Sequence, residues 1–182
     1  MQNYIFFDVE CANCYGGKGK ICTFGYVVVD ENFTILQKED VLINPAVEKW
    51  DWYVIKNMLA YKKKQMEAAP KFDAHYLKIA KLLTENRVCG FDVGLDIKYV
   101  NQDCERYNLP GLPVECFDVQ DFYKKHTAAE NKRGLSGVAE ELQLDLTAFN
   151  LHKSCDDAEI SMLILKELAK ITGQSIHQLT NQ

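Results

Sequence analysis

The chain has 182 residues, 47% of them hydrophobic and 26% charged, and a formal net charge of −5 at pH 7. These values are typical of one ordinary globular domain with a sizeable core. No apolar run approaches the ~20 residues of a membrane span, so we expect no membrane-spanning helix. The acidic balance argues against a protein that coats nucleic acid regardless of sequence, but it is compatible with a nucleic-acid enzyme.

Seven cysteines are scattered along the chain, and the N-terminus enters a strand without a basic leader or cleavage site. An odd, scattered set fits a reduced protein better than a disulfide scaffold. We therefore expect a cytoplasmic protein.

Three strands are predicted in the N-terminal quarter. Residues 3–9, 22–29 and 33–43 are rich in apolar, β-branched and aromatic side chains, with a Gly-rich loop and a polar turn between them. Their short connections favour an antiparallel meander.

The rest of the chain alternates helices with two further strands. The predicted helices cover residues 54–64, 73–84, 95–107, 120–125, 135–142 and 154–172, and the predicted strands cover residues 86–91 and 114–119. Helical spacing puts Ile79, Ala80, Leu82 and Leu83 on the inner face of helix 73–84 together with Tyr76 or Leu77, and Ser136 is the expected N-cap of helix 135–142. On the long helix 154–172, core spacing is shared by Ala158, Ser161, Met162, Leu165 and Leu168.

This order of elements predicts an α/β domain built on a mixed five-stranded sheet. We expect the domain to cover residues 1–172. Residues 173–182 are expected to be a C-terminal tail with one weak, exposed helix.

The first strand ends in two carboxylates. Side chains two apart on a strand share a face, so Asp8 and Glu10 in the stretch IFFDVE point the same way. Neighbouring carboxylates repel and are costly to desolvate. A bound cation is the simplest resolution.

Three other residues are candidates for the same cation site. Asp96 begins a helix after strand 86–91, and His152 precedes the last long helix. Asp157 lies in the first turn of that helix, where the helix dipole favours an anion. Carboxylates suit Mg²⁺ or Mn²⁺, and a metal pair stabilises the attacking and leaving oxygens in phosphodiester hydrolysis. The imidazole can take a proton from water near neutral pH.

Three motifs, FDVE, GFDVGLD and HKSCDDA, resemble in order those of the DEDDh 3′–5′ exonucleases, the group of the DNA polymerase III ε subunit within the ribonuclease H-like superfamily. The resemblance runs from Tyr4 to about Leu168. It implies a ribonuclease H-like sheet in which the strands after the meander are parallel.

The resemblance also implies roles for single residues. Asp8, Glu10 and Asp157 would bind the catalytic metal, while Asp8 would bridge to a second metal that Asp96 helps to hold. His152 would be the general base. Asp156, next to Asp157, is interpreted as a helix-start acid.

The chain departs from the family at three places. The family often has Thr-Thr-Gly after the glutamate, where this chain has Cys11-Ala12-Asn13. In the second motif, Phe91 and Asp92 stand where His-Asn is frequent. Cys11, Ala12 and Phe91 are nevertheless expected beside the terminal nucleotide. Residues 46–66 match no usual family segment.

Other features have a functional and a plainer interpretation. Lys132 and Arg133 lie in a loop that should be near the site, where we expect them to contact the nucleic-acid backbone. Trp50, Trp52 and Tyr53 could stack on a base, although a structural role is favoured. Cys11 and Cys14 form a C-x-x-C without a second pair, and surface roles are favoured for His75, His126 and His177.

The sequence thus predicts a metal-dependent enzyme that removes nucleoside 5′-monophosphates from the 3′ end of single-stranded DNA, with a DNA polymerase as a candidate protein partner. RNA trimming is the alternative substrate. A non-catalytic exonuclease-fold module that binds nucleic acid or polymerase is a rival class, against which all five filled positions argue. A Rossmann protein is disfavoured because no G-x-G-x-x-G follows the first strand.

Overall fold

The computed structural model describes residues 2–127 and 133–181. Its centre is a five-stranded sheet with the order β3-β2-β1-β4-β5. The strands are β1 Tyr4–Cys11, β2 Ile21–Val29, β3 Ile35–Leu42, β4 Arg87–Gly90 and β5 Cys116–Asp118.

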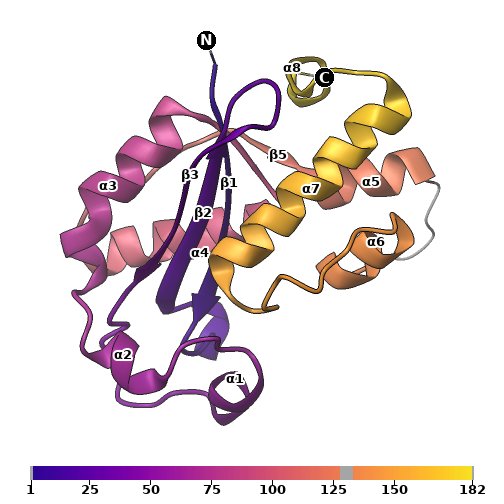
Figure 1. The fold of residues 1–182 in the computed structure, drawn as a ribbon. Helices are drawn as coiled ribbons and strands as arrows, with labels where there is room; N and C mark the ends of the chain where they lie inside the picture. The colour runs from indigo at the N-terminus through magenta and orange to yellow at the C-terminus, as the bar shows by residue number, and fades with distance from the viewer. Residues whose placement is uncertain (1, 128–132, 182) are drawn as a thin grey trace.

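Helices cover both faces of this sheet and one of its ends (Figure 1). They are the 3₁₀ turn η1 Tyr15–Gly17 and the helices α1 Trp52–Asn57, α2 Lys63–Glu67, α3 Phe72–Glu85, α4 Val93–Arg106, α5 Val119–Thr127, α6 Leu135–Glu141, α7 Ser154–Thr172 and α8 Ile176–Thr180. None of the helices in these ranges is long and apolar enough to cross a membrane.

Strand pairing confirms the predicted mixed sheet. β1 pairs antiparallel with β2, and β2 pairs antiparallel with β3, which makes the meander. β1 pairs parallel with β4, and β4 with β5. The first strand is thus the middle of the sheet, where both of its edges are paired.

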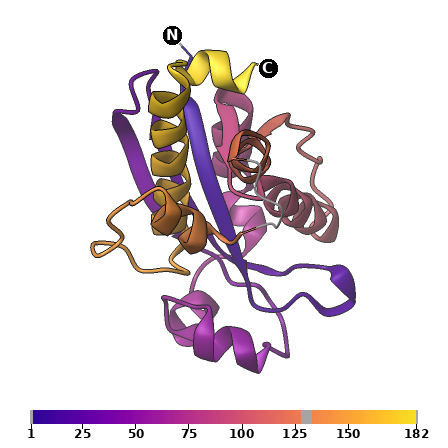
Figure 2. The same ribbon diagram turned by 90° about the vertical axis from the view of Figure 1, so that its right-hand side faces the viewer.

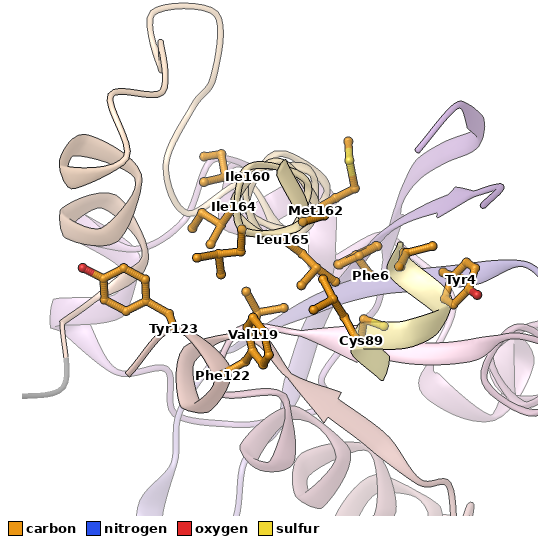
Figure 3. Close-up of a cluster of buried hydrophobic side chains, with 14 of the residues drawn as sticks. Tyr4, Phe6, Cys89, Val119, Phe122, Tyr123, Ile160, Met162, Ile164 and Leu165 are labelled. Atoms are coloured by element: carbon orange, nitrogen blue, oxygen red, sulfur yellow. The ribbon is translucent and has the colours of Figure 1, made fainter. Parts of the chain in front are cut away.

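The alternation of side chains along β1 separates two cores. Tyr4 and Phe6 pack in the cluster beneath α7, whereas Ile5 and Phe7 pack with side chains of α3 and α4. Figure 3 shows the α7 side, where Ile164 and Leu165 lie above Phe6, Cys89 and Val119. Asp8 and Glu10 have the same parity as Tyr4 and Phe6, so they belong to the α7 face.

Helix α7 has the predicted boundaries, and its five predicted core residues are all buried. Helix α3 buries Ile79 and Leu83, while Ala80 and Leu82 are partly buried against the same core. Tyr76 takes the inner position and donates its hydroxyl to the Pro110 carbonyl at 3.0 Å. Leu77, the other candidate for that position, is 80% exposed.

The predicted helix 54–64 is wrong. Two short helices, α1 and α2, replace it, with non-helical residues 58–62 between them. α1 begins early because the Asp51 carboxylate caps the Tyr53 N–H at 2.8 Å. The break allows Leu59 and Tyr61 to pack against a small cluster around Trp50 and Met66.

Several smaller expectations are also corrected. α6 begins one residue after its N-cap Gly134, so Ser136 lies inside the helix. α4 starts at Val93 rather than 95, because Asp92 adopts a left-handed conformation (φ 53°) and ends the turn. β5 is three residues long. α8 is not exposed, since Ile176 and Leu179 are fully buried in the α7 core.

Candidate active site

The predicted acidic residues meet at the end of the sheet where β1 stops. Asp8 and Glu10 from β1, Asp96 from α4, and His152 and Asp157 from the start of α7 all line one open cavity of about 360 Å³. Asp96 and Asp157 are 8% and 7% exposed, whereas the His152 side chain is 43% exposed. The cavity therefore has a buried acidic floor and an accessible imidazole at its rim.

Close packing against β2 positions the first turn of α7. Asp8 pairs with Gly25 in the sheet. A Cβ atom at Gly25 would lie 2.0 Å from the Cys155 backbone nitrogen and 2.1 Å from the Ser154 carbonyl carbon, so only glycine permits this contact. The helix start that carries Asp157 consequently lies directly over the strand pair that carries Asp8.

Polar contacts hold the same turn. The Thr23 and Ser154 hydroxyls lie 2.6 Å apart, and the Cys155 N–H donates to Asp40 Oδ1 at 2.8 Å. Asp40 Oδ2 in turn accepts from the Tyr61 hydroxyl at 2.6 Å. Asp40 thus satisfies one of the free N–H groups at the start of α7 from the neighbouring strand.

The two adjacent aspartates of α7 have different surroundings. Asp156 accepts from Lys38 Nζ at 2.7 Å and from the Asn150 N–H at 3.1 Å. Although burial opposes ionisation, these donors lower the pKa of Asp156 to about 2. Asp156 is therefore an ion-paired carboxylate that fastens the loop before α7, a larger role than that of a helix-start acid.

Asp157 faces the cavity and has no lysine partner among the described residues. Burial, and the neighbouring Glu10 and Asp156 carboxylates, raise its pKa to about 7, against the effect of the His152 backbone N–H. That N–H donates to Asp157 Oδ2 at 3.0 Å. The hydrogen bond fixes His152 in a left-handed conformation (φ 65°), which is unusual for a residue other than glycine.

The His152 ring points to the carboxylate of Glu10. Nδ1 lies 3.4 Å from Glu10 Oε1, and ligand atoms of Glu10, His152 and Asp157 all fall within 4.8 Å of one another. The hydrogen bond to Glu10 raises the pKa of His152, since the protonated ring is the better donor. Burial raises the pKa of Glu10, and His152 partly offsets this effect.

Asp8 and Asp96 complete the acidic floor. Burial and then the charges of Asp96, Glu10 and Asp157 raise the pKa of Asp8 well above its usual value. Burial also raises the pKa of Asp96, while a hydrogen bond from the Val9 backbone lowers it. Like charges held in a poorly solvated site favour protonation until a cation neutralises them.

The donor set fits divalent metal ions. Asp8 Oδ2 and Asp157 Oδ1 are buried, and no hydrogen bond from the described residues reaches either atom. Buried carboxylate oxygens normally have partners. Unpaired hard oxygens beside Glu10 and His152 are the ligands that Mg²⁺ or Mn²⁺ requires.

Only some of the residues predicted to contact nucleic acid line the cavity. Cys11 and Phe91 line the cavity, but Ala12 is fully buried and does not. Arg133 forms an ion pair with Glu141 at 3.2 Å. Lys132 lies outside the described residues.

Sequence reasoning missed several residues that shape the site. Gly25, Thr23 and Asp40 hold the start of α7, and Val54 of α1 and Met58, which follows α1, line the cavity. An isolated glycine inside a β-branched strand is a signal of close backbone approach and could have pointed to Gly25. Val54 and Met58 had no such signal, because the helix boundaries of this segment were predicted incorrectly.

Solved exonuclease structures have the same architecture. One is the nuclease domain of 3′hExo, a DEDDh family member bound to rAMP. Its match covers 94% of this chain and 93% of the 3′hExo chain, with a TM-score of 0.80 and 15% sequence identity. Another is a 3′-exonuclease that recognises the histone mRNA stem-loop. Its match covers 96% of this chain and 84% of the exonuclease chain, with a TM-score of 0.81 and 14% sequence identity.

Exonuclease I of E. coli with a dA16 oligonucleotide gives a TM-score of 0.78 and 14% identity, and the match covers all of this chain but only 42% of that enzyme. No curated protein matches the sequence of this chain.

A sequence model described as Exonuclease (RNase_T) matches residues 5–165, which include all five residues of the cavity floor and rim. That range is most of the 182 residues. The chain therefore belongs to the exonuclease family, and it shares its fold with a DEDDh family member.

Proposed function

We propose that this protein is a metal-dependent 3′–5′ exonuclease that releases nucleoside 5′-monophosphates from the 3′ end of single-stranded DNA. One observation carries the proposal: the convergence of Glu10, His152 and Asp157 within 4.8 Å, beside buried oxygens of Asp8 and Asp157 that the described residues leave unpaired. Metal-dependent phosphodiester hydrolysis requires such a set of hard ligands and a nearby base.

The residues divide into two roles. Asp8, Glu10, Asp96 and Asp157 would hold two divalent cations, Mg²⁺ or Mn²⁺. Such cations stabilise negative charge on the attacking and leaving oxygens. His152 would take the proton of the attacking water. Because Nδ1 of His152 faces Glu10, we assign the role of accepting the water proton to Nε2 of His152.

DNA is the substrate that the sequence favours, and RNA is the second candidate. A specific observation supports each of them. Exonuclease I, with the same fold, was solved with a DNA oligonucleotide, and the 3′-exonuclease with the same fold recognises a histone mRNA stem-loop. Association with a DNA polymerase and a cytoplasmic location stay predictions of the sequence.

The test uses 5′-labelled single-stranded DNA and RNA of matched sequence, each with a free or a 3′-phosphorylated end. We expect a ladder that shortens from the free 3′ end, release of nucleoside 5′-monophosphates, faster digestion of DNA, and no reaction in EDTA. Faster digestion of RNA would make the protein an exoribonuclease. Tight binding without digestion under any metal would instead favour a non-catalytic module.

A further inference from the structure

A short helix at the mouth of the cavity presents aromatic side chains to solvent. Trp52 and Tyr53 of α1 are 69% and 60% exposed, and Ile55 is 39% exposed. None of the six residues of α1 is buried against the described part of the chain. We call Trp52, Tyr53, Ile55 and Lys56 the α1 surface. Exposed aromatic groups of this kind mark interaction sites more often than isolated apolar residues do.

The segment that carries α1 is firmly attached to the sheet. Trp50 is 7% exposed and packs with the fully buried Met66. The Asp51 N–H donates to the Ala12 carbonyl at 2.9 Å, and the Asn13 side-chain amide donates to the Lys49 carbonyl at 2.7 Å. Trp50 therefore has the structural role favoured by the sequence, whereas Trp52 and Tyr53 do not share it.

The α1 surface is continuous with the cavity. Val54 and Met58, four residues apart, line the same cavity as the acidic residues. Trp52 and Lys56, also four residues apart, lie together on the outer side, with Lys56 Nζ 4.9 Å from the centre of the Trp52 ring. Figure 2 shows α1 and α2 beneath the end of the sheet where α7 begins. A chain leaving the cavity past α1 would meet Trp52 and Tyr53.

The charge of the segment that carries α1 favours a nucleic-acid strand over a protein as the partner of the α1 surface. Residues 49–64 contain five lysines and one aspartate, a formal charge of +4 in a chain of net charge −5. Lys49 also lies 5.6 Å from the ring of Tyr15 on the β1–β2 loop. Protein interfaces are depleted of lysine, whereas single-strand binding combines stacking aromatic rings with a basic surface.

We propose that the α1 surface binds the unpaired nucleotides that precede the terminal nucleotide of the substrate, by base stacking on Trp52 and Tyr53. Lys49, Lys56 and Lys62 attract the phosphates between those bases. The inference rests on the proposed function. It identifies the substrate as a single strand several nucleotides long, because paired bases cannot stack on protein side chains.

The test measures the affinity of fluorescein-labelled single-stranded oligonucleotides of 3 and 12 nucleotides, as DNA and as RNA, by anisotropy in EDTA. The double variant Trp52→Leu, Tyr53→Leu should bind the 12-mer at least about 30-fold more weakly than wild type, since stacking contributes ~1–3 kcal/mol per base and the variant removes two rings. Its affinity for the 3-mer should change much less. Trp52→Phe should keep most of the affinity, because it keeps a ring.

Ile171→Ala is the matched control, since Ile171 is 64% exposed at the far end of α7. The melting temperatures of all variants should stay close to that of wild type, because the altered side chains are exposed. A double variant that binds the 12-mer as tightly as wild type does would overturn the inference and leave the surface to a protein partner. Wild-type protein that digests neither DNA nor RNA with any metal would instead refute the proposed function.

Discussion

The backbone N–H of His152 donates a hydrogen bond to Oδ2 of Asp157 at 3.0 Å, and this contact holds the histidine in a left-handed conformation. A non-glycine residue in that conformation costs ~1–3 kcal/mol, so the surrounding structure must enforce it. The same carboxylate therefore places the imidazole with one oxygen and offers its other, buried oxygen to the cavity.

His152→Ala should lower kcat by about 10²–10⁴-fold, because general base catalysis is worth that much. KM should change little, since the metal ligands remain. Steady-state kinetics on a single-stranded oligonucleotide measures both constants. His177→Ala is the control, because His177 is exposed on α8. Wild-type kcat in His152→Ala would refute the assignment of the base.

Substitution by asparagine at each of the two neighbouring aspartates of α7 should have opposite effects on activity and on stability. Asp157→Asn should abolish digestion and leave the metal-free fold as stable as before or more stable, because it removes a carboxylate that burial and like charges disfavour. Asp156→Asn should retain the metal site but lower the free energy of unfolding by about 1–3 kcal/mol, because Lys38 loses its buried partner.

The sign of the pH effect follows from the pKa of Asp156. Its folded-state pKa of about 2 lies below the unfolded value, so its stabilisation is complete above about pH 4 and is lost as the pH falls toward 2. Urea unfolding at pH 7 and at pH 3 measures this. A larger cost of Asp156→Asn at pH 3 than at pH 7 would contradict the ion pair.

Metal-free protein should lose stability as the pH rises from about 4 to about 7. The folded-state pKa of Asp157 is raised to about 7, and those of Asp8 and Asp96 are raised as well, so these groups stabilise the fold only while they are protonated. Mg²⁺ or Mn²⁺ binds the ionised carboxylates and should raise the melting temperature more at pH 8 than at pH 6.

A metal concentration 100 times the dissociation constant would add ~2.7 kcal/mol to the free energy of unfolding. Thermal unfolding in EDTA and in saturating metal, each at pH 6 and at pH 8, gives the melting temperatures to compare. A shift that is equal at both pH values, or that persists in Asp157→Asn, would argue against metal binding at these carboxylates.

Gly25→Ala should displace the start of α7 and impair both stability and activity. The added Cβ would lie 2.0 Å from backbone of Cys155, and backbone cannot rotate away as a flexible side chain would. We expect a loss of ~1–3 kcal/mol in unfolding free energy, as in other overpacked sites. Gly137→Ala on α6 is the control, since its Cβ would meet only Arg133 at 3.9 Å.

Local patterns were sufficient to predict the three-stranded meander and the pair of carboxylates at the end of β1. Period-two alternation placed Asp8 and Glu10 on one face of β1, and the helical spacing of α7 predicted its buried residues. Both depend on side chains that are close in sequence.

What the sequence did not predict depends on contacts between distant segments. The break between α1 and α2 follows from packing of Leu59 and Tyr61 against Trp50, which hydrophobic periodicity does not encode. Likewise, the burial of α8 depends on α7, and the ion pair of Asp156 depends on Lys38, 118 residues earlier. Tertiary packing overrode local propensity in the first case.

The most direct test of the central claim compares wild type with Asp8→Asn on a 5′-labelled single strand, with Mn²⁺ and with EDTA. Asp8 is chosen because its buried Oδ2 lacks a partner among the described residues and an amide is nearly isosteric. We expect stepwise shortening from the 3′ end by wild type with metal, and none in EDTA or in the folded variant. Equal digestion by Asp8→Asn, or digestion in EDTA, would contradict it.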